Sequence, residues 1–174
     1  MRDSRSGVVV TSLLAVIAAS ACGSSKKEET TTTTEPPVEE TSEAAACGVD
    51  ICATYGPAVP KVASDITDKA AADPQFAKFF EPLVKKGPDA IAAFKKRLAD
   101  FIAVAYGCAD PSTYTGADMK TAHAGMGITS QQYDDFITLV AGVLAANGVP
   151  ESDINACFAP PLVAPEFKAM IVEQ

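Results

Sequence analysis

The sequence predicts an all-α domain, and two observations carry this prediction. Apolar residues recur at helical spacing in several segments, and no segment shows sustained alternation of apolar and polar residues with a period of two. End signals bracket the clearest segments, because Thr129-Ser-Gln-Gln132 has the form of a capping box, and Gly107 and Asn147-Gly148 are C-terminal stops. Residues 47–174 are long enough to bury one core, so we expect a single helical domain there.

The first predicted helix contains Val59, Val62 and Ile66 and ends near Asp73-Pro74. The second spans Pro88 to Tyr106. Its apolar face consists of Ile91, Phe94, Leu98, Phe101, Ile102 and Ala105, and Lys95, Lys96, Arg97 and Asp100 form a solvated face.

The third predicted helix begins at the capping box and ends at Asn147-Gly148. Its apolar stripe consists of Tyr133, Phe136, Ile137, Val140, Val143 and Leu144. A weaker helical segment begins near Glu151, is expected to break at Pro160-Pro161, and resumes from Glu166 to Val172.

His123 is the only histidine of the chain. A lone histidine cannot form a two-histidine metal site, and it is more often a satisfied structural residue than a ligand. It can, however, serve as the single protein ligand of a haem iron. Ser130 and Ser152 lie in capping contexts, so the sequence gives little support to a hydrolase.

The surroundings of His123 carry a family resemblance. The run Tyr114-Thr-Gly-Ala-Asp-Met119-Lys-Thr-Ala-His123, followed by Gly127-Ile128-Thr129 and an amphipathic helix, resembles the proximal half of a group I truncated haemoglobin. Asp73-Pro74-Gln-Phe-Ala-Lys-Phe79-Phe80 is similar to a corner of that family, and the likeness extends over residues 51–160. It implies a truncated globin-like fold, a 2-over-2 helical sandwich, with His123 as the proximal haem ligand.

The resemblance also implies the residues that surround the cofactor. Phe80, Phe94 and Leu98 would line the haem on one side, and Tyr114, Met119 and Ile128 would form the proximal wall. The haem would be of the b type, because covalent attachment needs Cys-x-x-Cys-His and no cysteine adjoins His123.

The distal positions depart from the family. Relatives usually place Phe-Tyr where this chain has Ile66 and Thr67, and they often place Gln where it has Leu98. The Tyr hydroxyl of those relatives hydrogen-bonds oxygen, and Thr67 is several ångströms shorter. We therefore expect weak oxygen binding.

Two functions of different classes follow. The first is binding of a diatomic gas (O2, NO or CO) at iron held by His123. For some family members this implies nitric-oxide dioxygenation, which would need an external reductase because the chain carries no Rossmann fingerprint. The alternative is a globin-derived module that has lost haem and serves as an envelope interaction or structural domain. The net charge of −8 and the lack of a large basic cluster disfavour nucleic-acid binding.

The first 46 residues predict export. Arg2 and Arg5 precede a short apolar run, which makes residues 1–21 a signal peptide. Ala19-Ser-Ala-Cys22 resembles a bacterial lipobox, so Cys22 is the expected lipidation site. Residues 22–46 are rich in Thr, Glu and Pro and form a tether. The protein would meet the membrane only through its lipid, at the outer membrane if the source is Gram-negative.

Four further cysteines belong to the domain: Cys47, Cys52, Cys108 and Cys157. An even number in an exported domain suggests two disulfides, with three possible pairings left open. The spacing of Cys47 and Cys52 matches neither a redox Cys-x-x-Cys motif nor a good zinc site, so a structural role is favoured over redox activity.

Overall fold

The computed structural model describes residues 47–174, and throughout this range the chain is helical or irregular, without a strand. The all-α prediction is therefore confirmed. The predicted signal peptide (1–21), the lipidation site Cys22 and the tether (22–46) lie outside the described residues. Within residues 47–174, every helix is too short or too polar to cross a bilayer.

The helices follow one another through short connections. They are α1 (Ile51–Tyr55), η1 (Gly56–Ala58), α2 (Val59–Ala72), α3 (Ala77–Lys85), α4 (Pro88–Ala105), η2 (Pro111–Thr113), α5 (Met119–His123), α6 (Ser130–Ala146), α7 (Glu151–Asp153), the π-helical turn η3 (Ile154–Phe158), α8 (Ala159–Val163) and α9 (Pro165–Ala169).

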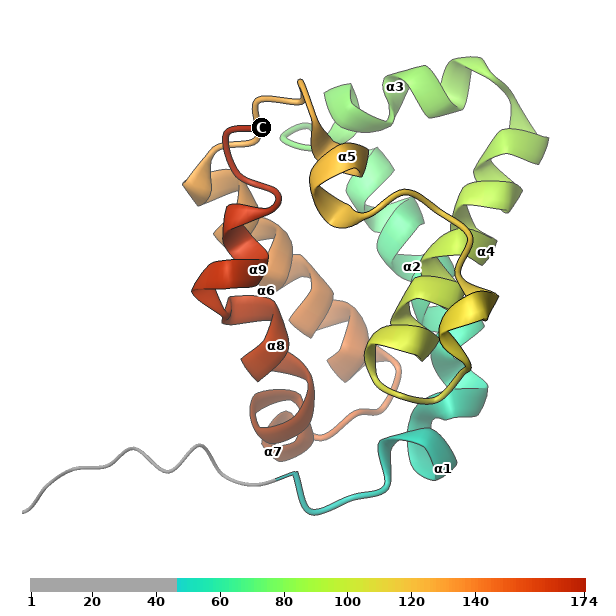
Figure 1. Ribbon diagram of the computed structural model, residues 1–174, viewed down its shortest axis with the longest axis vertical. Coiled ribbons are helices and arrows are strands. Elements are labelled where there is room, and N and C mark those ends of the chain that lie inside the picture. The colour runs from blue at the N-terminus through green and yellow to red at the C-terminus, as the bar shows by residue number, and fades with distance from the viewer. Residues whose placement is uncertain (1–46) are drawn as a thin grey trace, which may run out of the picture. The chain divides into compact units, whose positions relative to one another are not determined.

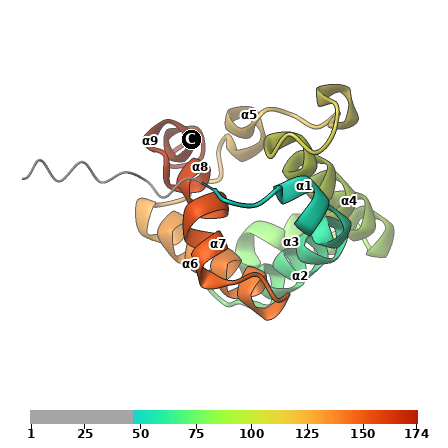
Figure 2. The same ribbon diagram turned by 90° about the horizontal axis from the view of Figure 1, so that it is seen from below.

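Two groups of helices face each other. Helix α2 packs against both α3 and α4, and α6 packs against η3 and α8. Figure 1 shows α2–α4 on one side and α6–α9 on the other, with α5 between them, and the view turned by 90° shows the same separation (Figure 2). Contacts between α2 and α6 join the groups, through a core that includes Val62, Ile66, Val143 and Leu144.

The three long helices match the sequence prediction. Helix α6 begins with the capping box, in which the Thr129 hydroxyl accepts from the Gln132 backbone N–H and the Gln132 side chain accepts from the Thr129 backbone. Helix α4 ends at Ala105 before Gly107, whose φ of 73° favours glycine. Periodicity and end signals agree at these positions, so sequence and structure coincide.

Two features of the helices differ from the prediction. Helix α3 was not expected as a helix, and it contains Pro82, a residue that disfavours helix interiors. The expected break at Pro160-Pro161 is wrong, because the chain stays helical from Glu151 to Val163 and breaks at Ala164. Both prolines fall in the first turn of α8, directly after the π-helical turn η3, and the first turn is the part of a helix that tolerates proline best.

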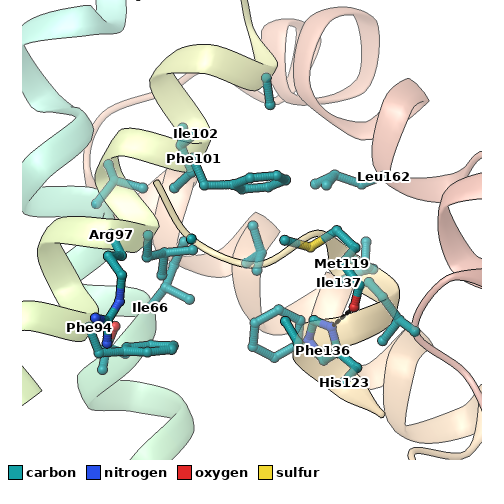
Figure 3. A pocket seen from close by; sticks show the side chains of 18 of the residues that line it. Ile66, Phe94, Arg97, Phe101, Ile102, Met119, His123, Phe136, Ile137 and Leu162 are labelled. Carbon is teal, nitrogen blue, oxygen red and sulfur yellow. Dashed lines mark hydrogen bonds between the residues drawn. The ribbon is translucent and has the colours of Figure 1, made fainter. Parts of the chain in front are cut away.

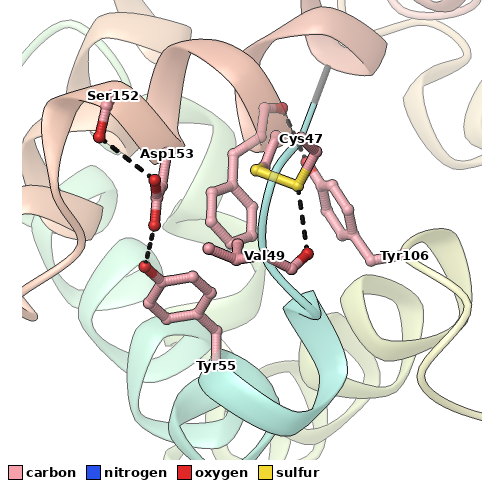
Figure 4. The surroundings of a disulfide bond; sticks show 8 residues. Cys47, Val49, Tyr55, Tyr106, Ser152 and Asp153 are labelled. Carbon is pink, nitrogen blue, oxygen red and sulfur yellow. Dashed lines mark hydrogen bonds between the residues drawn. A yellow bond between two sulfur atoms is a disulfide. The ribbon is translucent and has the colours of Figure 1, made fainter. Parts of the chain in front are cut away.

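The four cysteines of the domain form two disulfides, Cys47–Cys157 and Cys52–Cys108. Their Cα atoms lie 4.8 and 5.1 Å apart, within the usual range for a disulfide. Cys47–Cys157 ties the start of the domain to the π-helical turn (Figure 4). The expectation of two disulfides is confirmed, and one of the three pairings is now established.

An aromatic cluster lies close to the disulfides. The ring of Phe158, the neighbour of Cys157, makes edge contacts with Tyr55 and Tyr106 at centroid distances of 5.4 and 5.3 Å. Tyr55 donates a hydrogen bond to Asp153, and Tyr106 donates one to the Phe158 carbonyl (Figure 4). These contacts and the disulfides hold α1, the end of α4 and the turn η3 together at one end of the domain.

A histidine-bearing cavity as the candidate functional site

A large cavity lies between the two groups of helices. Its volume is about 1080 Å³, slightly above the roughly 300–1,000 Å³ of ordinary ligand pockets. Its lining is mostly apolar and comes from α2, α3, α4, α6 and the segments around α5 and α9. Every residue that the sequence analysis assigned to the cofactor and the distal pocket lines it: Ile66, Thr67, Phe80, Phe94, Leu98, Tyr114, Met119, His123 and Ile128.

These residues reach the cavity from opposite sides. Figure 3 shows Phe94 and Ile66, from α4 and α2, across the cavity from His123 and Met119 of α5. Phe80 of α3 makes an edge contact with Phe94 at a centroid distance of 5.9 Å, which connects two of the predicted residues directly. The arrangement places one imidazole opposite a wall of apolar side chains.

His123 is the last residue of α5, a helix that Asp118 caps by accepting from the Thr121 backbone N–H. After His123 the chain turns sharply through Gly125 and Gly127, whose φ values of 76° and 59° favour glycine. This turn is held by the C-terminal residues: the backbone N–H of Gly125 donates to Gln174, and that of Glu173 donates to Ile128, over 3.0 and 2.9 Å.

The proton on the imidazole can be assigned from its neighbour. His123 Nδ1 lies 2.7 Å from the Met119 carbonyl oxygen (Figure 3). A carbonyl only accepts, so Nδ1 carries the hydrogen and donates. In the neutral ring, Nε2 therefore keeps its lone pair, which is the state a metal ligand requires.

The loop before α5 is fixed by Tyr114. Its ring makes an edge contact with Phe101 of α4 at 5.4 Å, and its hydroxyl donates to the Ala117 carbonyl over 2.7 Å. The ring passes so close to Gly116 that a Cβ there would lie 2.3 Å from the Tyr114 hydroxyl. Only glycine fits at this position. The contact between Tyr114 and Phe101 anchors the loop that leads to His123 on α4.

The hydroxyl groups that line the cavity donate their protons elsewhere. Thr67, which is 2% exposed, donates to the Ala63 carbonyl of its own helix over 2.8 Å. All four tyrosines line the cavity, and each donates to another oxygen: Tyr55 to Asp153, Tyr106 to Phe158, Tyr114 to Ala117 and Tyr133 to Leu162. A ligand near Ile66 and Leu98 therefore meets apolar atoms.

Burial raises the pKa of three of the four tyrosines. It raises the pKa of Tyr106 to about 12, and burial together with the nearby Asp134 carboxylate raises the pKa of Tyr133 to about 12. Burial also raises the pKa of Tyr114. At neutral pH these phenols are uncharged, so tyrosinate does not compete with the imidazole for a metal in this cavity.

Part of the lining was not assigned to the site from the sequence. Tyr133 and Phe136 were placed on the apolar stripe of α6, but which neighbour that stripe would face depends on tertiary packing. Phe167 and Ile171 come from the last residues of the domain, where the sequence pattern is weak. Three cations, Lys78, Lys86 and Arg97, also line the cavity. The sequence placed Arg97 on the solvated face of its helix, and it gave no role to Lys78 or Lys86.

No protein-family model matches the chain.

Proposed function

We propose that this chain is a haem b protein of the truncated globin type, in which His123 is the protein ligand of the iron and a diatomic gas is the ligand on the opposite side. One observation carries the proposal: the only imidazole of the chain lines an apolar cavity of about 1080 Å³ with Nδ1 bound to a carbonyl and Nε2 free to ligate.

The residues present fit the group. The Met119 carbonyl fixes the tautomer of His123 and holds its ring, which is the supporting contact that metal-bound histidines need. Phe80, Phe94 and Leu98 supply apolar surface for a flat, hydrophobic macrocycle. When bound, an iron held by one imidazole offers an open position to O2, NO or CO.

The arrangement of the helices is consistent with a 2-over-2 sandwich. Helix α2 packs with α4, α6 packs with η3 and α8, and α2 and α6 are in contact. In this proposal α2 and α4 carry the distal residues, and α5 and the loops on either side of it carry the proximal residues Tyr114, Met119, His123 and Ile128. The short helix α5 carries both Met119 and His123, which line the cavity.

The chain's own residues form the surface that a gas ligand would meet on the distal side. Ile66, Leu98 and Thr67, whose hydroxyl donates to the Ala63 carbonyl, present mainly apolar atoms on the distal side. The proposal includes nitric-oxide dioxygenation, with electrons supplied by a separate reductase protein. NO or O2 is then the small partner of the site.

We further propose export and lipid anchoring through Cys22. The Arg-led apolar segment and the small residues before Cys22 support this, and so do two disulfides in the domain, which persist in oxidising compartments. Replacing Cys22 by serine should block processing of the precursor and release the protein from membranes. Unchanged membrane attachment and unchanged mass of the Cys22→Ser protein would show the assignment to be wrong.

The central test replaces His123. We expect His123→Ala to abolish stable haem binding, measured by the Soret band and by haem stoichiometry, because no second imidazole can take over. His123→Gly with added imidazole should recover the spectrum, since the free base can occupy the space left by the side chain.

Matched controls separate ligation from packing. Met119→Leu and Met126→Leu alter the lining next to His123 without removing the imidazole, and we expect both to retain the haem spectrum. Far-ultraviolet circular dichroism should show a helical fold in all variants. A normal ferrous Soret band in His123→Ala would refute the ligand assignment, and wild-type protein that takes up no haemin would favour the haem-free module.

A further inference from the structure

The segment that forms α3 and α4 is basic within an acidic protein. Residues 77–105 carry six cationic and three acidic side chains, although the chain as a whole has a net charge of −8. The cations divide into two sets of three. One set is paired with carboxylates, and the other lines the cavity.

The paired set consists of Lys85, Lys95 and Lys96. Lys85 binds Glu81 at 2.7 Å, Lys95 binds Asp68 of α2 at 2.7 Å, and Lys96 binds Asp100 at 2.6 Å. None of these three lysines lines the cavity. Their charges are accounted for by ordinary surface ion pairs.

The cavity set consists of Lys78, Lys86 and Arg97, which line the cavity from α3, from the end of α3 and from α4. Within residues 47–174, none of the three forms an ion pair with a carboxylate. Lys78 lies over the Phe79 ring, 4.6 Å from its centroid. All three are exposed, so they belong to the solvent side of the cavity, while the interior is apolar.

We infer that Lys78, Lys86 and Arg97 form an acid-binding rim and that the occupant of the cavity is a largely apolar molecule bearing one or more carboxylates. The apolar interior takes the hydrophobic body, and the three cations take the acid group at the surface. This inference rests on the proposed function in that haem b, with its two propionates, is one member of this class. A long-chain fatty acid is another source of the same chemistry.

The test compares acids with their esters on the full chain. Haemin and haemin dimethyl ester are titrated by absorbance, and palmitate and methyl palmitate by calorimetry. Esterification removes the negative charge and keeps the apolar body. We expect the wild-type protein to bind at least one acid about tenfold more tightly than its ester, a difference of about 1.4 kcal/mol. That preference should weaken as salt is raised, because exposed charges are screened.

Two variants of equal charge change assign the effect to the rim. In Lys78→Gln/Lys86→Gln/Arg97→Gln the preference for the acid over the ester should disappear, with ester binding unchanged. In Lys85→Gln/Lys95→Gln/Lys96→Gln, which removes three cations from the same helices, the preference should remain. Circular dichroism and thermal melting should confirm that both variants are folded.

Each outcome separates the rim from the haem proposal. Equal binding of haemin and its ester, with no preference for palmitate, would overturn the rim and leave haem binding intact. The same would follow if both triple variants lost the preference equally. Palmitate binding that depends on the rim, without haemin binding, would support the rim and overturn the haem proposal. Failure of both acids to bind would overturn both.

Discussion

Replacing Thr67 by tyrosine should place a hydrogen-bond donor in the distal part of the cavity. Thr67 is buried in α2, and its short side chain donates to the Ala63 carbonyl over 2.8 Å instead of into the cavity. A tyrosine ring carries its hydroxyl several ångströms farther from the backbone, past the reach of Ala63. Thr67 lines the cavity, so the tyrosine ring would extend into the space shared by the haem and its gas ligand.

The magnitude follows from the charge of the ligand. Oxygen draws negative charge from ferrous iron, so a donor near it makes a charge-assisted hydrogen bond of ~1.5–3 kcal/mol. At 1.4 kcal/mol per factor of ten, the dissociation of oxygen should slow by roughly 10- to 150-fold. Carbon monoxide carries little charge when bound, so its dissociation should change much less.

Stopped-flow dissociation rates for both gases measure this effect. Thr67→Phe is the matched control, because it has the size of tyrosine without the hydroxyl, and the comparison of Tyr with Phe isolates the hydrogen bond. Thr67→Val tests the wild-type residue itself. Since the Thr67 hydroxyl already donates to Ala63, removing it should leave the oxygen rate within about twofold, well under 1 kcal/mol.

Two results would refute this reasoning. If Thr67→Val speeds oxygen loss tenfold, the threonine hydroxyl reaches the ligand after all. If wild-type oxygen dissociation is already slow and Thr67→Tyr does not slow it further relative to Thr67→Phe, another group donates in the distal pocket. The tyrosine hydroxyls are poor candidates for that group, because all four donate to other oxygens.

Further predictions concern the scaffold. Cys47→Ala/Cys157→Ala should lower the free energy of unfolding by about 2–4 kcal/mol, because the disulfide closes a loop of 110 residues; urea unfolding checks this, and a loss under about 1 kcal/mol would contradict it. Thiol labelling of denatured, unreduced protein should find none of the four domain cysteines free, and two reactive thiols would revive a redox role. Gly116→Ala should displace Tyr114 and destabilise the protein by about 1–3 kcal/mol, and an unchanged melting temperature would show that the loop adapts.

The parts of the fold that sequence predicts well are those in which independent signals agree. Helix α6 has a capping box, an apolar stripe and a terminal Asn-Gly, and its observed bounds follow them. Helix α3 has no such agreement, since its nine residues include Pro82. The break near Pro160 was misplaced because a proline in the first turn of a helix and a proline that ends one look alike in sequence.

The candidate site shows a similar division. The spacing of Tyr114, Met119 and His123 predicted residues that do line one cavity. The direction of each hydroxyl and the pairing of each lysine could not be predicted, because they depend on which helices become neighbours. The carbonyl that fixes the His123 tautomer is a local contact, since Met119 lies one helical turn before His123 in α5.

The disulfide pairing joins the first of the four domain cysteines to the last and encloses the other pair. A chain that emerges from its N-terminus exposes Cys47, Cys52 and Cys108 to an oxidant before Cys157 arrives. Any bond that Cys47 forms during that interval is non-native and must be exchanged later. Oxidation of this domain can therefore finish only after Cys157 has emerged, and a thiol–disulfide isomerase would speed that exchange.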